Sequence, residues 1–300
     1  AFQALLAIGE IAGPSAQPDI RAIGLSIYAD LLKDEYSEMD IVGPTLPALR
    51  GLLLSDAKAV AKEEIYPRLV HGLLSACLQN IDDMSGRASK TAILKTKNNL
   101  LAAVLILTVS PAELKLSQAA VEHCCFLISQ KLLETSEISL AAAQCLKTLM
   151  TVSPNNSAMQ YAASMLLPGA ITFIVNCAAE DDAGQAACLP TLEEILRATN
   201  ILCTQTPEEH RSRMFGALMP PISSLLGGGD GGASPMHVAA ISQILSFATL
   251  SPAAFRECAS LMKQDQRDLM ETSIRQAVAE REKSTAHTST SKPQIALRAF

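Results

Sequence analysis

Hydrophobic positions in this chain recur every three to four residues over most of its length, the period of an amphipathic α-helix. The opening residues already show the pattern, with Phe2, Leu5, Ile8 and Ile11 spaced in this way. Polar, Pro-containing or Gly-rich corners divide the pattern into helices that come in pairs. We predict helices over 1–12, 18–33 with 41–54, 57–79 with 89–109, 112–134 with 137–151, 156–179 with 183–203, 207–226 with 235–250, and 253–263 with 266–283.

A short phrase ending in proline recurs at near-constant intervals. LTVSP at 107–111, MTVSP at 150–154 and ATLSP at 248–252 are close copies, and LCTQTP at 202–207 is a looser one. Their prolines are 43, 53 and 45 residues apart. HEAT and armadillo repeats recur about every 40–47 residues and hold two or three helices each. The spacing therefore predicts an all-α, HEAT/armadillo-like helical-repeat solenoid, an α-α superhelix.

Each copy of the phrase ends one apolar helix and begins the next. Ser and Thr are good N-caps, and proline suits the first helical position because an amide proton there has no partner within the helix. Two copies also place an acidic residue at the third helical position, Glu113 after Ser110 and Glu209 after Thr206. This arrangement predicts capping boxes, in which the carboxylate bonds the amide of the cap residue.

Other prolines and glycines interrupt the helical pattern. We expect Pro168 to break the 156–179 segment, and Pro220 and Pro221 to kink or end the 207–226 helix, because proline removes a backbone hydrogen bond. The sequence LGGGDGG at 226–232 predicts a flexible linker. It lacks the Lys-Ser/Thr pair and the preceding strand of a phosphate-binding loop.

The two ends of the predicted array differ in polarity. Residues 263–283 are rich in charge, and a solenoid needs a polar outer face on its terminal repeat. No polar cap precedes Phe2. We therefore expect residues 1–283 to form about six and a half helix pairs at the C-terminal end of a longer array.

The last residues, 284–300, are predicted to form a flexible Ser/Thr-rich tail that cannot pack. It ends in a short apolar motif whose candidate protein-binding residues are Pro293, Ile295, Leu297 and Phe300. This motif can add to another protein as an extended strand or dock in a groove. The alternative is a disordered end that happens to hold a few apolar residues.

Composition agrees with a helical core. Hydrophobic residues make up 49% of the chain, charged residues 18% and aromatics 4%, with no Trp. Ala, Leu, Ile and Met suit closely packed helices, whereas strands use more Val, Thr, Tyr and Phe. The longest apolar runs, such as 100–109, fall short of the roughly 20 residues of a membrane span. We therefore expect no transmembrane segment.

Charge and cysteine usage exclude further classes of protein. A net charge of −6 argues against nucleic acid as a partner, because a phosphate backbone is bound by clustered Lys and Arg. The eight cysteines form no C-x-x-C pair, and a secreted disulfide scaffold would be shorter and denser in cysteine. Buried free thiols in a reducing compartment are the expected explanation.

No constellation of catalytic or metal-binding residues stands out. The five histidines are far apart in the sequence, at His71, His123, His210, His237 and His287. Cys124 and Cys125 follow His123, but adjacent residues on a helix point in different directions. No nucleophile elbow or kinase signature is present. We therefore expect no enzyme activity, no cofactor, and no catalytic, cofactor-binding or metal-binding residues.

Parts of the sequence resemble a known family. Residues 20–34 (IRAIGLSIYADLLKD), followed by 42–49 (VGPTLPAL), and the PQIAL of 293–297 resemble the C-terminal region of the large HEAT-repeat accessory proteins of clathrin adaptors. Those proteins act in trans-Golgi and endosomal traffic. The resemblance covers about the first 60 residues and the tail, and the middle of the chain carries no matching motif.

The resemblance implies a very long cytosolic solenoid that helps adaptor complexes assemble on membranes. The expected function is a non-enzymatic protein-binding scaffold in clathrin-adaptor-dependent vesicle traffic, cytoplasmic and peripheral to Golgi and endosomal membranes. Its expected partners are an adaptor complex or its accessory subunits, and self-association into a homo-oligomer is a further expectation. The alternative is a HEAT-repeat scaffold of another system, such as a nuclear-transport receptor or a phosphatase scaffold.

Overall fold

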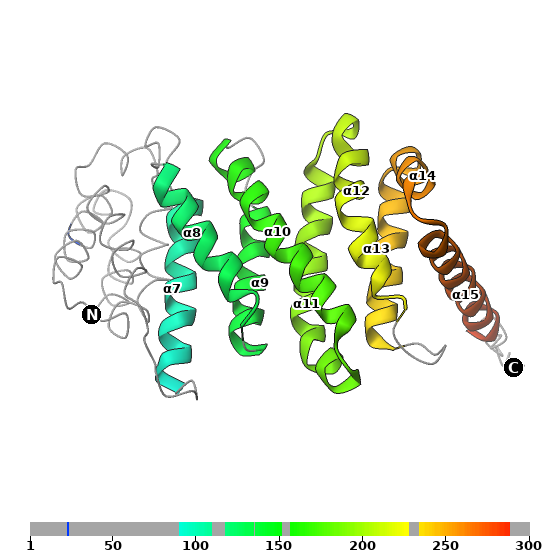
Figure 1. The fold of residues 1–300 in the computed structure, drawn as a ribbon, viewed down its shortest axis with the longest axis horizontal. Coiled ribbons are helices and arrows are strands. Elements are labelled where there is room, and N and C mark those ends of the chain that lie inside the picture. Colours follow the sequence, from blue (N-terminus) through cyan, green and yellow to red (C-terminus); the bar gives the residue numbers. More distant parts are fainter. Residues whose placement is uncertain are drawn as a thin grey trace, which may run out of the picture. The chain divides into compact units, whose positions relative to one another are not determined.

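A computed structural model of the protein describes Ile23 and residues 90–109, 118–134, 136–151, 157–227 and 234–288. Over these residues it holds nine α-helices with bounds of their own and no β-strand, which confirms the all-α class (Figure 1). The helices are α7 (Lys90–Val109), α8 (Gln118–Lys131), α9 (Ser136–Thr151), α10 (Ser157–Ala179), α11 (Asp182–Gln205), α12 (Glu208–Ser224), α13 (Pro235–Leu250), α14 (Pro252–Leu261) and α15 (Gln264–Thr288).

Most of the predicted boundaries from residue 89 onward agree with these helices to within two residues. The predicted helices over 1–79, the corners at 110–111 and 153–154, and most of the Gly-rich segment lie outside the described residues, although Ile23 itself is helical. Helix α15 is longer than predicted, because it continues to Thr288 instead of ending at 283. The Ser, Thr and Ala residues after 283 carry only small helix penalties, so an existing helix extends through them at little cost.

The corner before α12 differs from the predicted capping box. Pro207 occupies the N-cap position and makes no side-chain cap bond, so the pairing of Thr206 with Glu209 is wrong. The corner is closed by backbone acceptors instead. The His210 amide donates to the Pro207 carbonyl at 2.9 Å, and Arg211 Nε donates to the Thr206 carbonyl at 3.1 Å.

The two Ser-Pro corners of the second half also differ from each other. Ser251 is the N-cap of α14 with Pro252 at the first helical position, as predicted, but its hydroxyl makes no cap bond. Ser234, which lies outside the repeated phrase, is a true side-chain cap. Its Oγ accepts a hydrogen bond from the amide of His237 at 3.2 Å.

The predicted break at Pro168 is wrong, because α10 runs through it unbroken. Pro168 leaves the carbonyl of Ser164 without its helical donor, and both residues are exposed. Water can therefore satisfy that carbonyl, which makes the proline tolerable. Pro220 and Pro221 likewise lie inside α12, which ends three residues later at Ser224.

The described helices fall into two compact units. The first holds α7, α8, α9 and the adjoining halves of α10 and α11, residues 157–173 and 190–205. The second holds 174–189 and α12 to α15. Its core contains the stacked rings of Phe215 and Phe247, whose centroids are 4.7 Å apart and which are both fully buried.

Within the first unit, helices of successive pairs contact each other. We call α8 and residues 157–173 of α10 the first-helix row. Tyr161 Oη donates to Glu122 Oε1 at 2.8 Å across 39 residues, and Cys125 Sγ donates to the Ala162 carbonyl at 4.0 Å across 37 residues. In the second unit, Cys258 Sγ donates to the Ser212 carbonyl at 2.8 Å across 46 residues. Residues that contact each other between successive pairs are thus separated in the sequence by about the interval that the repeated proline phrase predicts.

Candidate protein-binding groove

The second helices of successive pairs form a row of their own in the first unit. We call α7, α9 and residues 190–205 of α11 the second-helix row. Lys97 Nζ on α7 lies 3.1 Å from Glu137 Oε2 on α9, and Lys147 Nζ on α9 lies 2.5 Å from Glu194 Oε2 on α11. The two pairs join residues 40 and 47 positions apart, so this row repeats with the same period.

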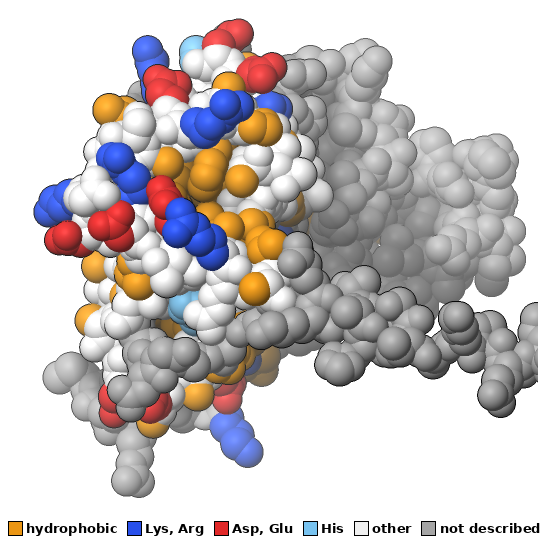
Figure 2. Space-filling model, turned by 90° about the vertical axis from the view of Figure 1, so that its right-hand side faces the viewer, with side chains coloured by type: hydrophobic (Ala, Val, Ile, Leu, Met, Phe, Trp, Pro, Cys, Tyr) orange, Lys and Arg blue, Asp and Glu red, His pale blue; other side chains and the backbone are white. Residues whose placement is uncertain are grey.

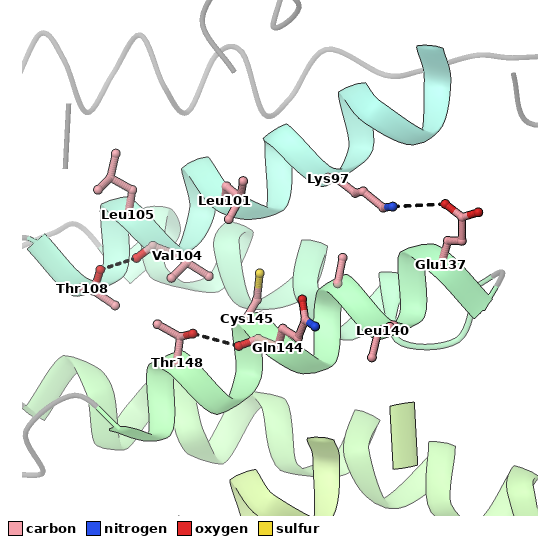
Figure 3. A pocket seen from close by; sticks show the side chains of 11 residues that line it. Lys97, Leu101, Val104, Leu105, Thr108, Glu137, Leu140, Gln144, Cys145 and Thr148 are labelled. Atoms are coloured by element: carbon pink, nitrogen blue, oxygen red, sulfur yellow. Dashed lines mark hydrogen bonds and ion pairs between the residues drawn. The ribbon is translucent and has the colours of Figure 1, made fainter. Parts of the chain in front are cut away.

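A groove with a volume of about 710 Å³ lies between α7 and α9 (Figure 3). Both helices line it with residues three or four positions apart, which share one helix face. The lining residues are Lys97, Leu101, Val104, Leu105 and Thr108 of α7, and Glu137, Leu140, Ala141, Gln144, Cys145 and Thr148 of α9.

The groove has a buried apolar floor and an exposed apolar rim. Val104, Leu105 and Cys145 are buried, whereas the Leu101 side chain is 48% exposed. An exposed leucine beside buried apolar side chains is the arrangement expected where a further apolar surface can pack. The groove therefore offers hydrophobic contact that the described residues do not fill.

Apart from the Gln144 amide, the polar side chains of the lining are already engaged. Lys97 and Glu137 pair with each other, so the lining carries no net charge. Thr108 Oγ1 donates to the Val104 carbonyl at 2.8 Å, and Thr148 Oγ1 donates to the Gln144 carbonyl at 2.9 Å. These bonds turn both hydroxyls toward their own helices and leave their methyl groups as further apolar surface.

The thiol in the groove is not a nucleophile at neutral pH. Burial raises the pKa of the Cys145 thiol to about 12, so the thiol stays protonated. Reactive cysteines need a thiolate, which requires a lowered pKa and an electropositive setting. Cys145 therefore contributes to the groove as a small apolar side chain.

Beyond α9 the second-helix row becomes charged. The Glu194 side chain is 12% exposed and lies between two cations, because Arg197 Nη1 is 2.6 Å from its Oε1 and Lys147 Nζ is close to its Oε2. Arg197 Nη2 is also 3.3 Å from Glu193 Oε2. The adjacent carboxylates Glu193 and Glu194 are thus neutralised by their neighbours. The apolar groove lies at the α7 side of the row.

A second apolar surface lies on the first-helix row. Phe126 is 61% exposed, Tyr161 and Met165 are also exposed, and the exposed Leu133 follows just after α8. At one end of this strip, hydrogen bonds from Gln118 and Tyr161 lower the pKa of Glu122, which therefore stays ionised. The groove, whose volume and lining residues are defined, is the candidate site.

The cysteines and histidines behave as expected of packed helices. Of the described cysteines, which are all free, Cys188 is half-buried and the others are buried, while Cys77 lies outside the described residues. This confirms the prediction of buried free thiols for six of them. His123 is half-buried beside the fully buried Cys124 and Cys125. Over the described residues, no three His, Cys, Asp or Glu side chains are grouped as a metal site would require.

The tail motif Pro293, Ile295, Leu297 and Phe300 lies outside the described residues, so its role stays a prediction. Figure 2 looks at the molecule from the side on which α15 lies in Figure 1, and shows charges of both signs with hydrophobic side chains between them. On α14 and α15, exposed side chains include the charged Asp265, Asp268, Glu271 and Arg275 and the apolar Leu261, Leu269 and Val278.

One stretch of the described chain, Tyr161–Ala179, is long and apolar enough to cross a membrane, with 19 residues and a mean hydropathy of 1.7. This segment is longer than the longest apolar runs expected from the sequence. A core helix meets the same criterion of length and composition. Ala162, Leu166 and Ala170 of this segment are buried against protein, as in a core helix.

In this chain, a helix of one pair contacts the corresponding helix of the next pair, about one repeat further along the sequence. This arrangement defines a helical-repeat protein, a class that serves as a scaffold for other proteins. Comparison with known families matches residues 117–287, more than half of the chain, to the family described as "LAA1-like, C-terminal TPR repeats". The chain belongs to this family. A comparison of the sequence with curated proteins found no match.

The family match covers the region in which the sequence offered no matching motif, and it ends at 287, beside the end of α15 at Thr288. It names TPR repeats where HEAT-like repeats were predicted. Both are repeats of antiparallel helix pairs, and the contact intervals of 37 to 46 residues are closer to the HEAT length of about 40–47 than to the TPR length of about 34.

Proposed function

We propose that this chain is a non-enzymatic, protein-binding part of a scaffold that assists clathrin-adaptor-dependent traffic between the trans-Golgi and endosomes. Its membership of the LAA1-like family supports the proposal. So does the resemblance of residues 20–34 and 42–49 to adaptor accessory proteins. In this role the chain is cytoplasmic and associates with Golgi and endosomal membranes through its partners, which are the adaptor complex or its accessory subunits.

The observation that carries the binding role is the uncharged apolar groove between α7 and α9. Catalysis needs groups with a tuned pKa or a metal, held where a substrate can reach them. The groove instead has paired charges, threonines bonded to their own helices and a protonated thiol. Such a lining can recognise a complementary apolar surface, as a scaffold does.

Affinity capture with the whole chain tests this function. Immobilised chain is expected to recover adaptor-complex subunits or their accessory proteins from cell extract, and the tagged chain is expected to co-localise with trans-Golgi and endosomal markers. Recovery of a small GTPase of nuclear transport, or of a phosphatase catalytic subunit, in place of adaptor proteins would contradict it. Light scattering over a range of protein concentrations separately tests the expected self-association.

A further inference from the structure

We propose that the α7–α9 groove binds an amphipathic α-helix about three turns long, supplied by a partner protein and entering with an uncharged apolar face. The inference rests on the proposed scaffold function and adds to it the form of the ligand. The length of the groove, the state of its polar groups and its charge support it.

The length of the groove suits a short helix. Its lining runs from Lys97 to Thr108 on α7 and from Glu137 to Thr148 on α9. At about 1.5 Å per residue, each wall is roughly 17 Å long, which is the length of about 11 helical residues. A helix of this length presents anchors at positions i, i+3 or i+4, and i+7. Leu101 and Leu105 on one wall and Leu140 on the other are the apolar side chains that such anchors would meet.

The state of the polar groups favours a helix over an extended peptide. An extended peptide brings unpaired backbone N–H and C=O groups and needs partners for them. Lys97, Glu137 and the two threonines of the lining are already bonded. Of the lining's polar side chains, the Gln144 amide alone has no bond to any residue that the structure describes. A helix satisfies its own backbone and makes no such demand.

The charge of the groove selects the face of the helix that enters it. The lining is electrically neutral, since its two charged side chains pair with each other at 3.1 Å. A charged side chain placed against Leu101, Leu105 and Cys145 would lose its hydration without gaining a free counter-charge. The entering face is therefore built of residues such as Leu, Ile, Met or Ala, and the charged residues of the ligand helix remain in water.

The probe that tests this inference is a fluorescent Ala/Lys peptide of about 14 residues with leucines at i, i+4, i+7 and i+11, held helical by a staple on its polar face. One control peptide has the same composition with the leucines dispersed around the helix. A second control keeps the leucine spacing but is unstapled and carries a central proline. Binding to the full chain is measured by fluorescence polarisation.

Two matched variants locate the binding site. Leu101→Glu places a charge on the groove rim, and Leu94→Glu places the same charge on the same helix outside the lining. Both leucines are about half exposed, at 48% and 51%, so neither change disturbs the core. We expect the striped helix to bind the unchanged chain and the Leu94→Glu variant equally, and the Leu101→Glu variant at least about tenfold more weakly. Both control peptides are expected to bind at least about tenfold more weakly than the striped helix.

Four results would overturn the inference. These are undiminished binding to the Leu101→Glu variant, equal binding of the proline peptide, binding only after residues 292–300 are deleted, and conversion of a dimer to a monomer by Leu101→Glu. The third result would assign the groove to the chain's own tail, and the fourth would assign it to a second copy. A chain that still captures adaptor proteins after Leu101→Glu but binds no helix refutes the groove inference alone. A chain that binds the helix but captures no adaptor proteins refutes the trafficking role alone.

Discussion

The two rows of helices in the first unit pack in different ways. In the first-helix row, α8 and α10 are so close that a Cβ atom on Gly169 would lie 2.2 Å from Ser129 Oγ. One to two turns earlier, Cys125 Sγ lies 4.0 Å from the carbonyl of Ala162. In the second-helix row, α7 and α9 are joined by an ion pair at one end and leave a groove of about 710 Å³.

The two rows therefore offer different contacts: a close approach of two helices in the first-helix row and a groove in the second-helix row. Small residues let two helix backbones approach closely, and close packing gives the dense contacts that hold neighbouring repeats together. In the second-helix row, Leu101 stays about half exposed beside the groove, so apolar surface remains available to another protein. The first-helix row therefore has a close backbone approach at Gly169, and the second-helix row has a groove with room for a ligand.

The largest expected difference concerns two thiols, one from each row. Burial raises the pKa of Cys125 to about 11 and that of Cys145 to about 12. At pH 8 a free thiol of pKa about 8.5 is roughly one-quarter thiolate. We therefore expect iodoacetamide to modify Cys125 a few hundred times, and Cys145 a few thousand times, more slowly in the folded chain than in urea. Peptide mapping by mass spectrometry gives the rate at each site.

The half-buried Cys188 serves as the internal control for these rates. Reaction of Cys145 as fast as Cys188 would show that the floor of the groove is open to water. The same pKa shifts predict a pH dependence of stability. Unfolded thiols begin to ionise at about pH 8, whereas the folded thiols stay protonated up to about 11 and 12, so unfolding becomes easier as the pH rises through this window. Below about pH 7 these thiols leave stability unchanged.

The next effect tests the close approach in the first-helix row. Gly169→Val drives a branched side chain into Ser129 of α8, and we expect it to lower the free energy of unfolding by about 3 kcal/mol. Gly216 lies inside α12 with nothing within 4 Å of the position that its Cβ would take. Gly216→Val should therefore change stability by less than about 0.5 kcal/mol. Urea unfolding followed by circular dichroism measures both, and equal effects would refute the close contact.

A single type of substitution can compare both rows directly. Ala162 is fully buried in the first-helix row, and Ala141 is half-buried on the wall of the groove. We expect Ala162→Leu to destabilise the chain by about 2 kcal/mol through overpacking. Ala141→Leu should change stability by less than about 0.5 kcal/mol, because its added carbons occupy free volume. Thermal unfolding distinguishes the two, and a loss of similar size at Ala141 would mean that the second row is closed as well.

The sequence predicts the helices far better than the surfaces that they form. The prediction of 235–250 agrees with Pro235–Leu250 because caps, prolines and apolar periodicity are local signals. Two local predictions were wrong. At Thr206, hydrogen bonds to backbone carbonyls replace the predicted capping box, and at Pro168 the helix continues because solvent can bond the carbonyl that the proline leaves without a donor.

The groove had no such signal in the sequence. Leu101 and Leu105 lie on one apolar stripe of α7, and the pattern alone assigns both to the core. In the structure Leu105 is buried, but Leu101 is about half exposed. The residues of α9 that line the groove beside them, such as Leu140 and Ala141, are 30 or more positions away, and no window on α7 contains them.

The smallest expected effects come from the two ion pairs that join helices of the second-helix row. Lys147 and Glu194 should be coupled by about 1 kcal/mol, since Glu194 is mostly buried and an unpaired buried carboxylate is unfavourable. Lys97 and Glu137 are more exposed, and their coupling should be below about 0.5 kcal/mol. Double-mutant cycles with alanine, measured by urea unfolding at low and high salt, give both values. The Lys97–Glu137 coupling should disappear at high salt, because solvent screens an exposed pair. A Lys97–Glu137 coupling as large as that of Lys147 and Glu194 would mean that solvent does not screen the Lys97–Glu137 pair, and would contradict the exposure of its two side chains.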